Sequence, residues 1–275
     1  MEFSYVMSGI VVLVEWILAA VIYAVGWYRS KDDLNPLGDA LAVAGVVTAL
    51  VGIIIWLAWS APVDLALIQS SLASGLAVSA LSIYTVLSRR RRERLSASAM
   101  LTTAILVQAY AVGRLWLGGE AIQPEVFLPA WMVIRTVTGL AGYGGLAVAA
   151  TLILLSFALS RMGGRLPDDR LKAVEDLSRL EWQSLQIALV ALSASLSVGL
   201  ICFWWGLGQV LVGGSAGALV TWLLLTAGVY SLMQDAVPLR LARVLLVVAF
   251  LVGVVASLTM AGPLIAGASS LASTG

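Results

Sequence analysis

The 275-residue sequence contains no histidine and only one cysteine, Cys202. Histidine is the commonest ligand of protein-bound metal ions and the only side chain that titrates near neutral pH when unperturbed. A single cysteine excludes an intrachain disulfide, a CxxC redox pair and a cysteine-based zinc site. The chain also lacks a Ser-His-Asp set and a Walker motif, so the sequence shows no catalytic constellation and predicts no metal site, and it leaves open whether the protein is an enzyme.

Charged residues are scarce as well, at 11% of the chain, whereas hydrophobic residues make up 61%. Soluble domains average about 25% charged residues, and a soluble core of this size cannot bury so much apolar surface. In lipid, only helices and closed barrels satisfy the backbone, and the apolar runs here do not alternate. The sequence therefore predicts an all-α, polytopic membrane helix bundle, with residues 1–275 forming a single transmembrane domain. The net charge of +1 gives no indication of a nucleic-acid partner.

Apolar windows predict eight transmembrane helices, because each window has about the 20 residues that a bilayer requires. The predicted spans are Val6–Trp27, Leu37–Trp59, Leu65–Leu87, Ala97–Leu117, Ala130–Leu159, Leu185–Trp205, Val210–Met233 and Val237–Gly262. The first span follows no basic segment of the kind that opens a cleavable signal peptide, so we expect it to be retained. The third span contains Gln69 and several serines, so we expect it to face other helices rather than lipid.

Lysine and arginine are concentrated in alternate loops. Those loops contain Arg29 and Lys31 after the first span; Arg89, Arg90, Arg91, Arg92 and Arg94 after the third; Arg161, Arg165, Arg170, Lys172 and Arg179 after the fifth; and Arg240 and Arg243 after the seventh. They account for 14 of the 16 basic residues. Because cytoplasmic loops carry an excess of basic residues, we expect these loops to be cytoplasmic and both termini extracytoplasmic. The predicted location is the plasma (inner) membrane.

The two remaining basic residues, Arg114 and Arg135, lie near predicted outer ends of spans, on either side of a loop that contains Glu120 and Glu125. Each arginine could extend to lipid headgroups or pair with these glutamates. Alternatively, the two guanidiniums could bind an anionic ligand, because arginine grips carboxylates through two hydrogen bonds. The sequence leaves both interpretations open.

Glu15 lies about 13 Å along the first predicted span. A carboxyl group inside the membrane is a functional candidate. It could equally be protonated and hydrogen-bonded to serines of a neighbouring helix.

Tryptophan gathers at the predicted outer ends of the spans. The residues concerned are Trp56, Trp59, Trp116, Trp131, Trp204 and Trp205. They could form the aromatic belt that is common at membrane interfaces. They could also form an aromatic platform for a flat hydrophobic ligand.

Several segments together resemble the integral-membrane cytochrome c assembly proteins, a haem-handling family. Residues 59–64, the following polar helix and the arginine run 89–94 resemble the family's outer Pro-x-x-Asn segment, helix and basic turn. Residues 131–135, followed by Tyr143, are similar to its Trp-x-x-x-His element and subsequent tyrosine. Residues 174–180 resemble a charged cytoplasmic element, and Trp205-Gly206, Trp222 and Tyr230 resemble the tryptophan-rich outer loop and the next helix.

The resemblance implies that the outer face carries haem, that the tryptophan-rich loop packs on the porphyrin, and that haem is delivered to apocytochrome c. In the family, outer histidines ligate the iron. In this chain Arg135 stands at one of those positions, and an always-protonated guanidinium cannot ligate iron. The resemblance therefore implies a divergent member whose axial ligands are absent or come from a partner chain. The candidate surface for haem or another anionic ligand comprises Arg114, Trp131, Arg135, Trp204, Trp205 and Gly206.

Two functions remain open because every histidine is missing. The chain could be a divergent haem-handling protein of c-type cytochrome maturation. It could instead be a non-catalytic structural subunit of a larger electron-transfer complex, since small residues, including 26 glycines, favour close contacts with other membrane subunits. A transporter that uses Glu15 would need internal inverted repeats, and none is evident in the sequence.

Overall fold

In a computed structural model, the described part of the chain folds into eight α-helices and contains no strand. The helices are α1 (Glu2–Arg29), α2 (Asn35–Trp59), α3 (Leu65–Leu87), α4 (Arg94–Leu117), α5 (Ala130–Arg161), α6 (Leu171–Trp204), α7 (Val212–Gln234) and α8 (Leu239–Thr259). Besides these helices, the structure describes Ser88, Val237 and Pro238. The all-α fold class predicted from the sequence is confirmed.

Within the described residues, seven helices, α1 to α7, are long and apolar enough to cross a membrane. The chain is therefore a multi-pass membrane protein. Helix α8 is not among these seven helices. It carries Arg240 and Arg243 near its start and has no charged residue from 244 to 255. The crossing of α8, like the direction of the bundle, remains a prediction.

The bounds of the third predicted span agree with α3, but the predicted start of the sixth span, Leu185, is wrong. Helix α6 begins at Leu171, and its membrane-length apolar window begins at Leu177. The charged stretch 174–180, which precedes the predicted span, belongs to this helix. Its Leu177 and Leu180 lie one turn apart and are both buried in the core. With 34 residues, α6 is about 51 Å long and exceeds the roughly 30 Å hydrocarbon core.

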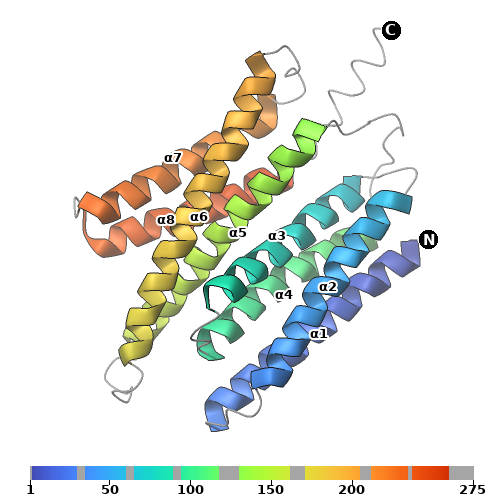
Figure 1. Cartoon of the computed structure of the whole chain (residues 1–275), viewed down its shortest axis with the longest axis horizontal. Coiled ribbons are helices and arrows are strands. Elements are labelled where there is room, and N and C mark those ends of the chain that lie inside the picture. The colour runs from blue at the N-terminus through green and yellow to red at the C-terminus, as the bar shows by residue number, and fades with distance from the viewer. Residues whose placement is uncertain are drawn as a thin grey trace.

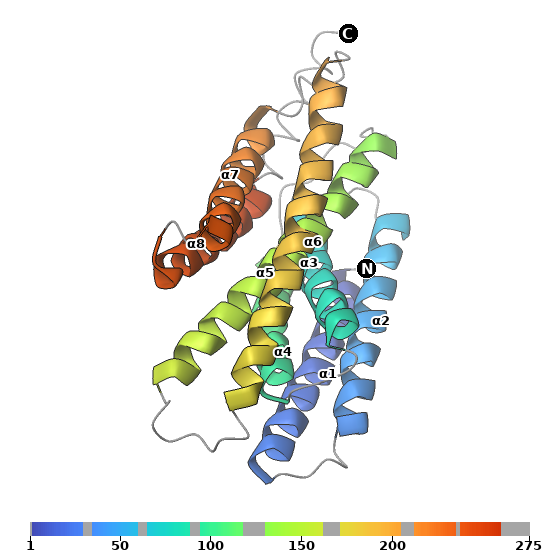
Figure 2. The same cartoon turned by 60° about the vertical axis from the view of Figure 1, so that its left-hand side comes forward.

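Successive helices run in opposite directions (Figure 1), with α1, α3, α5 and α7 pointing towards the lower left and the even-numbered helices returning. Helices α1 to α4 pack together on one side, and the α7–α8 hairpin lies on the other side in both views (Figures 1 and 2). Helix α5 connects the two parts because it packs against α3, α6 and α8. Residues 142–153 of α5 are all buried, which makes this helix the centre of the bundle.

Glycines allow α5 to approach its neighbours closely. A Cβ atom added to Gly142 would lie 2.9 Å from the backbone nitrogen of Leu192 in α6. A Cβ atom on Gly145 would lie 2.9 Å from the carbonyl oxygen of Ser184, also in α6. Both distances are shorter than van der Waals contact, so the two backbones pack at a separation that only glycine permits. The glycine cluster in the fifth span is therefore a packing surface.

Helix α3 faces other helices, as its polar residues predicted. In its membrane window 56% of the residues are buried, compared with 22% in α2. The Ser70 hydroxyl donates to the carbonyl oxygen of Ala111 in α4 at 2.8 Å. Ser74 is also buried, so the serines of this helix point into the bundle and away from lipid.

Candidate functional site

Arg135 lies at the shared end of α5 and α6, one helical turn after Trp131. Its carbonyl oxygen accepts hydrogen bonds from Ser195 of α6 at 3.0 Å and from Thr138 of its own helix at 3.1 Å. A Cβ atom on Gly199 would lie 3.3 Å from Cζ and Nε of the guanidinium. Gly199 therefore leaves room for the half-buried guanidinium against the backbone of α6. The two helices together hold this charge at their common end.

Arg114 occupies the last turn of α4 and is half-buried. Its Nε donates to Oε1 of Gln69 in α3 at 2.8 Å. The glutamates that the sequence suggested as partners, Glu120 and Glu125, lie outside the described residues. The structure thus places Arg114 on the α3–α4 pair and Arg135 on the α5–α6 pair, each held by a different neighbouring helix.

The other residues of the predicted haem surface are described less completely. Trp131 lies at the start of α5 and Trp204 ends α6, but the structure describes only their backbone positions. Trp205 and Gly206 lie outside the described residues. Trp116, at the end of α4, is 74% exposed, as expected of an aromatic residue at a membrane interface.

Two residues that carried the family resemblance occupy different environments in α7. The indole Nε1 of Trp222 donates to the hydroxyl of Ser193 in α6 at 2.8 Å, so Trp222 ties these helices together. Tyr230 is 61% exposed and lies on the outward side of α7. Tyr143 of α5 is buried, and Gly253 of α8 leaves space for its ring. These positions support helix packing more than a shared ligand surface.

Glu15 lies in the interface between α1 and α2. Its Oε1 accepts a 3.5 Å hydrogen bond from Thr48 of α2, so the hydroxyl partner is a threonine, whereas one of the two sequence interpretations named serines. Among the described residues, Oε2 of Glu15 and Nε1 of the adjacent Trp16 are buried without a hydrogen-bond partner. The Trp16 ring is fully buried and contacts Gly45 of α2. Glu15 is therefore a poorly satisfied polar group within a tightly packed helix pair.

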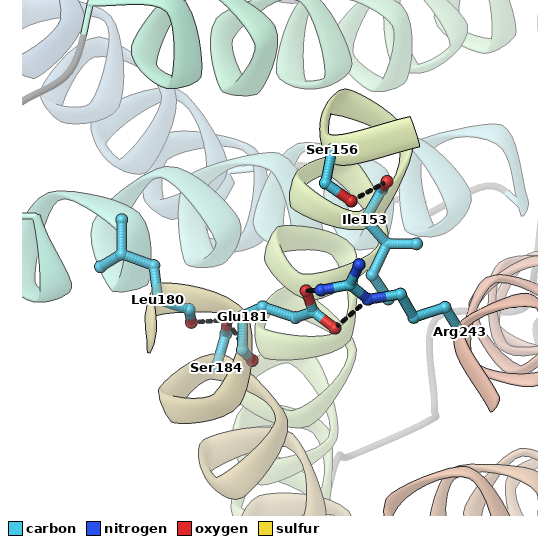
Figure 3. Close-up of polar contacts among 6 residues, drawn as sticks. All are labelled: Ile153, Ser156, Leu180, Glu181, Ser184 and Arg243. Atoms are coloured by element: carbon cyan, nitrogen blue, oxygen red, sulfur yellow. Dashed lines mark hydrogen bonds and ion pairs between the residues drawn. The ribbon is translucent and has the colours of Figure 1, made fainter. Parts of the chain in front are cut away.

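An ion pair that the sequence interpretation missed joins α6 to α8 (Figure 3). Arg243 donates from Nε to Oε1 of Glu181 at 3.1 Å and from Nη2 to Oε2 at 2.7 Å. The side chains of Arg243 and Glu181 are only 17% and 6% exposed. A signal was present, because Leu177, Glu181, Ser184 and Ala188 recur at helical spacing and all are buried. Because the predicted sixth span began at Leu185, Glu181 was placed outside it with the preceding charged residues, and the ion pair was missed.

The described residues offer no clustered metal-binding site. They contain no group of three or more cysteine, aspartate or glutamate residues that could hold a metal ion. The whole sequence lacks histidine, and arginine cannot replace it as a ligand. The guanidinium of Arg135 is a group that can pair with a carboxylate.

Comparisons with protein-family models, curated proteins and solved structures gave no match. A fold alone does not define a function.

Proposed function

We propose that this chain is a divergent haem-handling membrane protein that acts on the extracytoplasmic face in the maturation of c-type cytochromes. The observation that carries the proposal is the position of Arg135. Its guanidinium is half-buried against Gly199 at the end of α5 and α6. Arg135 lies one turn after Trp131, and Gly199 lies five residues before Trp204, where α6 ends. A cation between two helix ends that carry aromatic residues suits a flat, apolar ligand with carboxylate groups.

The proposed role of Arg135 is to hold a propionate of haem. A guanidinium offers two parallel hydrogen bonds to a carboxylate, and partial burial strengthens such a pair relative to water. Arg114 would add a second positive charge at the same predicted face, although its Nε already donates to Gln69. Because the chain has no histidine, the axial ligands of the iron in this proposal are absent or come from a partner chain, and apocytochrome c is the recipient of the haem.

The experiment is purification of the full-length protein in a mild detergent, followed by an absorption spectrum and a haem assay. We expect wild-type protein to contain haem, Arg135→Gln to contain several-fold less, and the control Arg240→Gln, at the opposite end of the bundle, to match wild type. A deletion strain should contain less c-type cytochrome. Protein free of haem, together with normal c-type cytochromes in the deletion strain, would contradict the proposal.

A second function, as a structural subunit of a larger membrane complex, needs no ligand and is compatible with the use of polar residues for packing between helices. Arg114 binds Gln69, Trp222 binds Ser193 and Arg243 binds Glu181, so each of these polar groups joins two helices of this chain. Stoichiometric co-purification with a large complex, without haem on this chain, would support this function. Isolation of the protein only as a monomer would exclude it.

A further inference from the structure

The Glu181–Arg243 pair forms one wall of a pocket between α6 and the α7–α8 hairpin. The pocket has a volume of about 410 Å³, within the range of roughly 300–1,000 Å³ that is usual for small-molecule sites. Ser178, Glu181 and Arg243 provide its polar wall, whereas Trp182, Leu232 and Met233 provide apolar surface. The pocket lies at the opposite end of α6 from Gly199 and Trp204, so it is separate from the proposed haem surface.

The charges in this wall restrict the chemistry of a ligand. Glu181 and Arg243 are both ionisable and lie side by side, so an anionic ligand meets the carboxylate and a cationic ligand meets the guanidinium. The two hydrogen bonds between them use Nε and Nη2 of Arg243, which leaves the Nη1 hydrogens unengaged by Glu181. The carboxylate oxygens each retain further acceptor capacity. A ligand that carries both a negative and a positive group can therefore extend the pair without opposing either charge.

The position of the pocket along the helices indicates an amphiphilic ligand. Its lining residues lie where the apolar windows of α6, which begins at Leu177, and α7, which ends at Gln234, meet their polar flanks. This is the depth of lipid headgroups in a bilayer. Met233 and Leu239 lie at adjoining ends of α7 and α8 and are 64% and 56% exposed, so apolar side chains line the mouth of the pocket.

We propose that the pocket binds the headgroup of a zwitterionic phospholipid with a primary ammonium, the phosphate contacting Arg243 and the ammonium contacting Glu181. A primary ammonium can donate hydrogen bonds to the carboxylate, whereas a trimethylated ammonium cannot. A purely anionic headgroup would place a second negative charge beside Glu181. The order of affinity is therefore phosphatidylethanolamine, then phosphatidylcholine, then phosphatidylglycerol.

The test is native mass spectrometry of the full-length protein in detergent, titrated with each of these three lipids at matched acyl chains. We expect one phosphatidylethanolamine per chain to bind at least about tenfold more tightly than phosphatidylcholine, which corresponds to the loss of one charge-assisted hydrogen bond. Equal binding of all three lipids, or binding of many molecules without saturation, would overturn the proposal.

Variants of the lining residues test whether the lipid preference depends on this pocket. Arg243→Gln and Glu181→Gln should abolish the preference, and Arg240→Gln, an exposed arginine that does not line the pocket, should retain it. Because breaking the ion pair can impair folding, Met233→Trp provides an independent test that narrows the pocket and leaves both charges in place. Met7→Trp, on the exposed side of α1, is its matched control. A Met233→Trp protein that retains the full preference would show that the lipid does not occupy this pocket.

Discussion

Glu181 of α6 and Arg243 of α8 reach toward each other (Figure 3), and both side chains are largely buried. Removing two charges from water is unfavourable, and the paired geometry with hydrogen bonds of 3.1 and 2.7 Å offsets part of that penalty. Replacing one partner leaves the other charge buried without a counter-charge, whereas replacing both leaves no buried charge. Hence the stability of the bundle should depend more on the two charges being paired than on their presence.

We expect Glu181→Gln or Arg243→Gln to destabilise the protein by roughly 3 kcal/mol, the range for breaking a buried ion pair. The double variant Glu181→Leu/Arg243→Met should be more stable than either single variant. Thermal unfolding in detergent measures the three proteins against Arg240→Gln. Single variants that unfold at the same temperature as this control would show that the pair is too well solvated to matter.

Arg114 gives a second prediction on single residues. Gln69→Leu removes the acceptor of the 2.8 Å hydrogen bond from Arg114 Nε, so the half-buried guanidinium loses a partner that links α3 and α4. The expected loss of stability is about 1–2 kcal/mol. Thr102→Ala is the control, because its exposed hydroxyl bonds only to its own helix, at Ser98. Equal unfolding temperatures for the two variants would contradict an interhelical role for Arg114.

Among the helices, α5 is the element on which packing depends most, because its glycines meet backbone atoms of α6. A methyl group at Gly145 would lie 2.9 Å from Ser184 O and 3.0 Å from Ala188 N, and backbone atoms cannot move aside as a flexible side chain can. A methyl group at Gly113 of α4 would meet no atom within 4 Å. The two glycines are thus chemically identical sites in different surroundings.

Gly145→Ala should destabilise the protein by about 1–3 kcal/mol through overpacking. Gly113→Ala should be neutral or should stabilise it by up to about 1 kcal/mol, because alanine is the better helix former. Thermal unfolding of both variants under the same conditions compares them directly. If the Gly145→Ala protein is as stable as Gly113→Ala, then α5 and α6 can move apart to accommodate a methyl group without a loss of stability.

The sequence predicted the helices well where charged or proline-containing segments bound them, as for α3 between Pro62 and the arginine run 89–94. It failed at the start of α6, because Arg179 and Glu181 resemble loop residues when read one by one. In space they differ: Arg179 is exposed, whereas Glu181 is buried and paired with a residue 62 positions later. Such a partner becomes evident only when the packing of α8 against the bundle is known.

The same limit applies to the candidate site. Sequence position placed Arg114 and Arg135 near helix ends, and the structure agrees. The Arg114–Gln69 bond and the space above Gly199 depend on which helices are neighbours, and hydropathy does not determine that arrangement.

At the scale of the whole molecule, the distribution of arginine predicts the direction of the bundle. The positive-inside bias requires the loop at residues 89–93 to be cytoplasmic and the loop at 118–129 to be outside. In a Cys202→Ala background, Arg91→Cys should be protected from a membrane-impermeant maleimide in intact cells, and Gly118→Cys should be labelled. Permeabilised cells provide the control, since both cysteines should then react. The reverse pattern would place Arg114 and Arg135 on the cytoplasmic side and remove the basis of the proposed function.

The most direct measurement is a titration of the purified full-length protein with haem. Binding is monitored by the shift of the main absorption band of haem and by the quenching of tryptophan fluorescence. We expect saturable binding of one haem per chain. The affinity should fall about tenfold or more in Arg135→Gln, which loses a charge-assisted contact, and should be unchanged in Arg240→Gln. A spectrum that changes only in proportion to added haem, or equal affinity in wild type and Arg135→Gln, would contradict the proposed function.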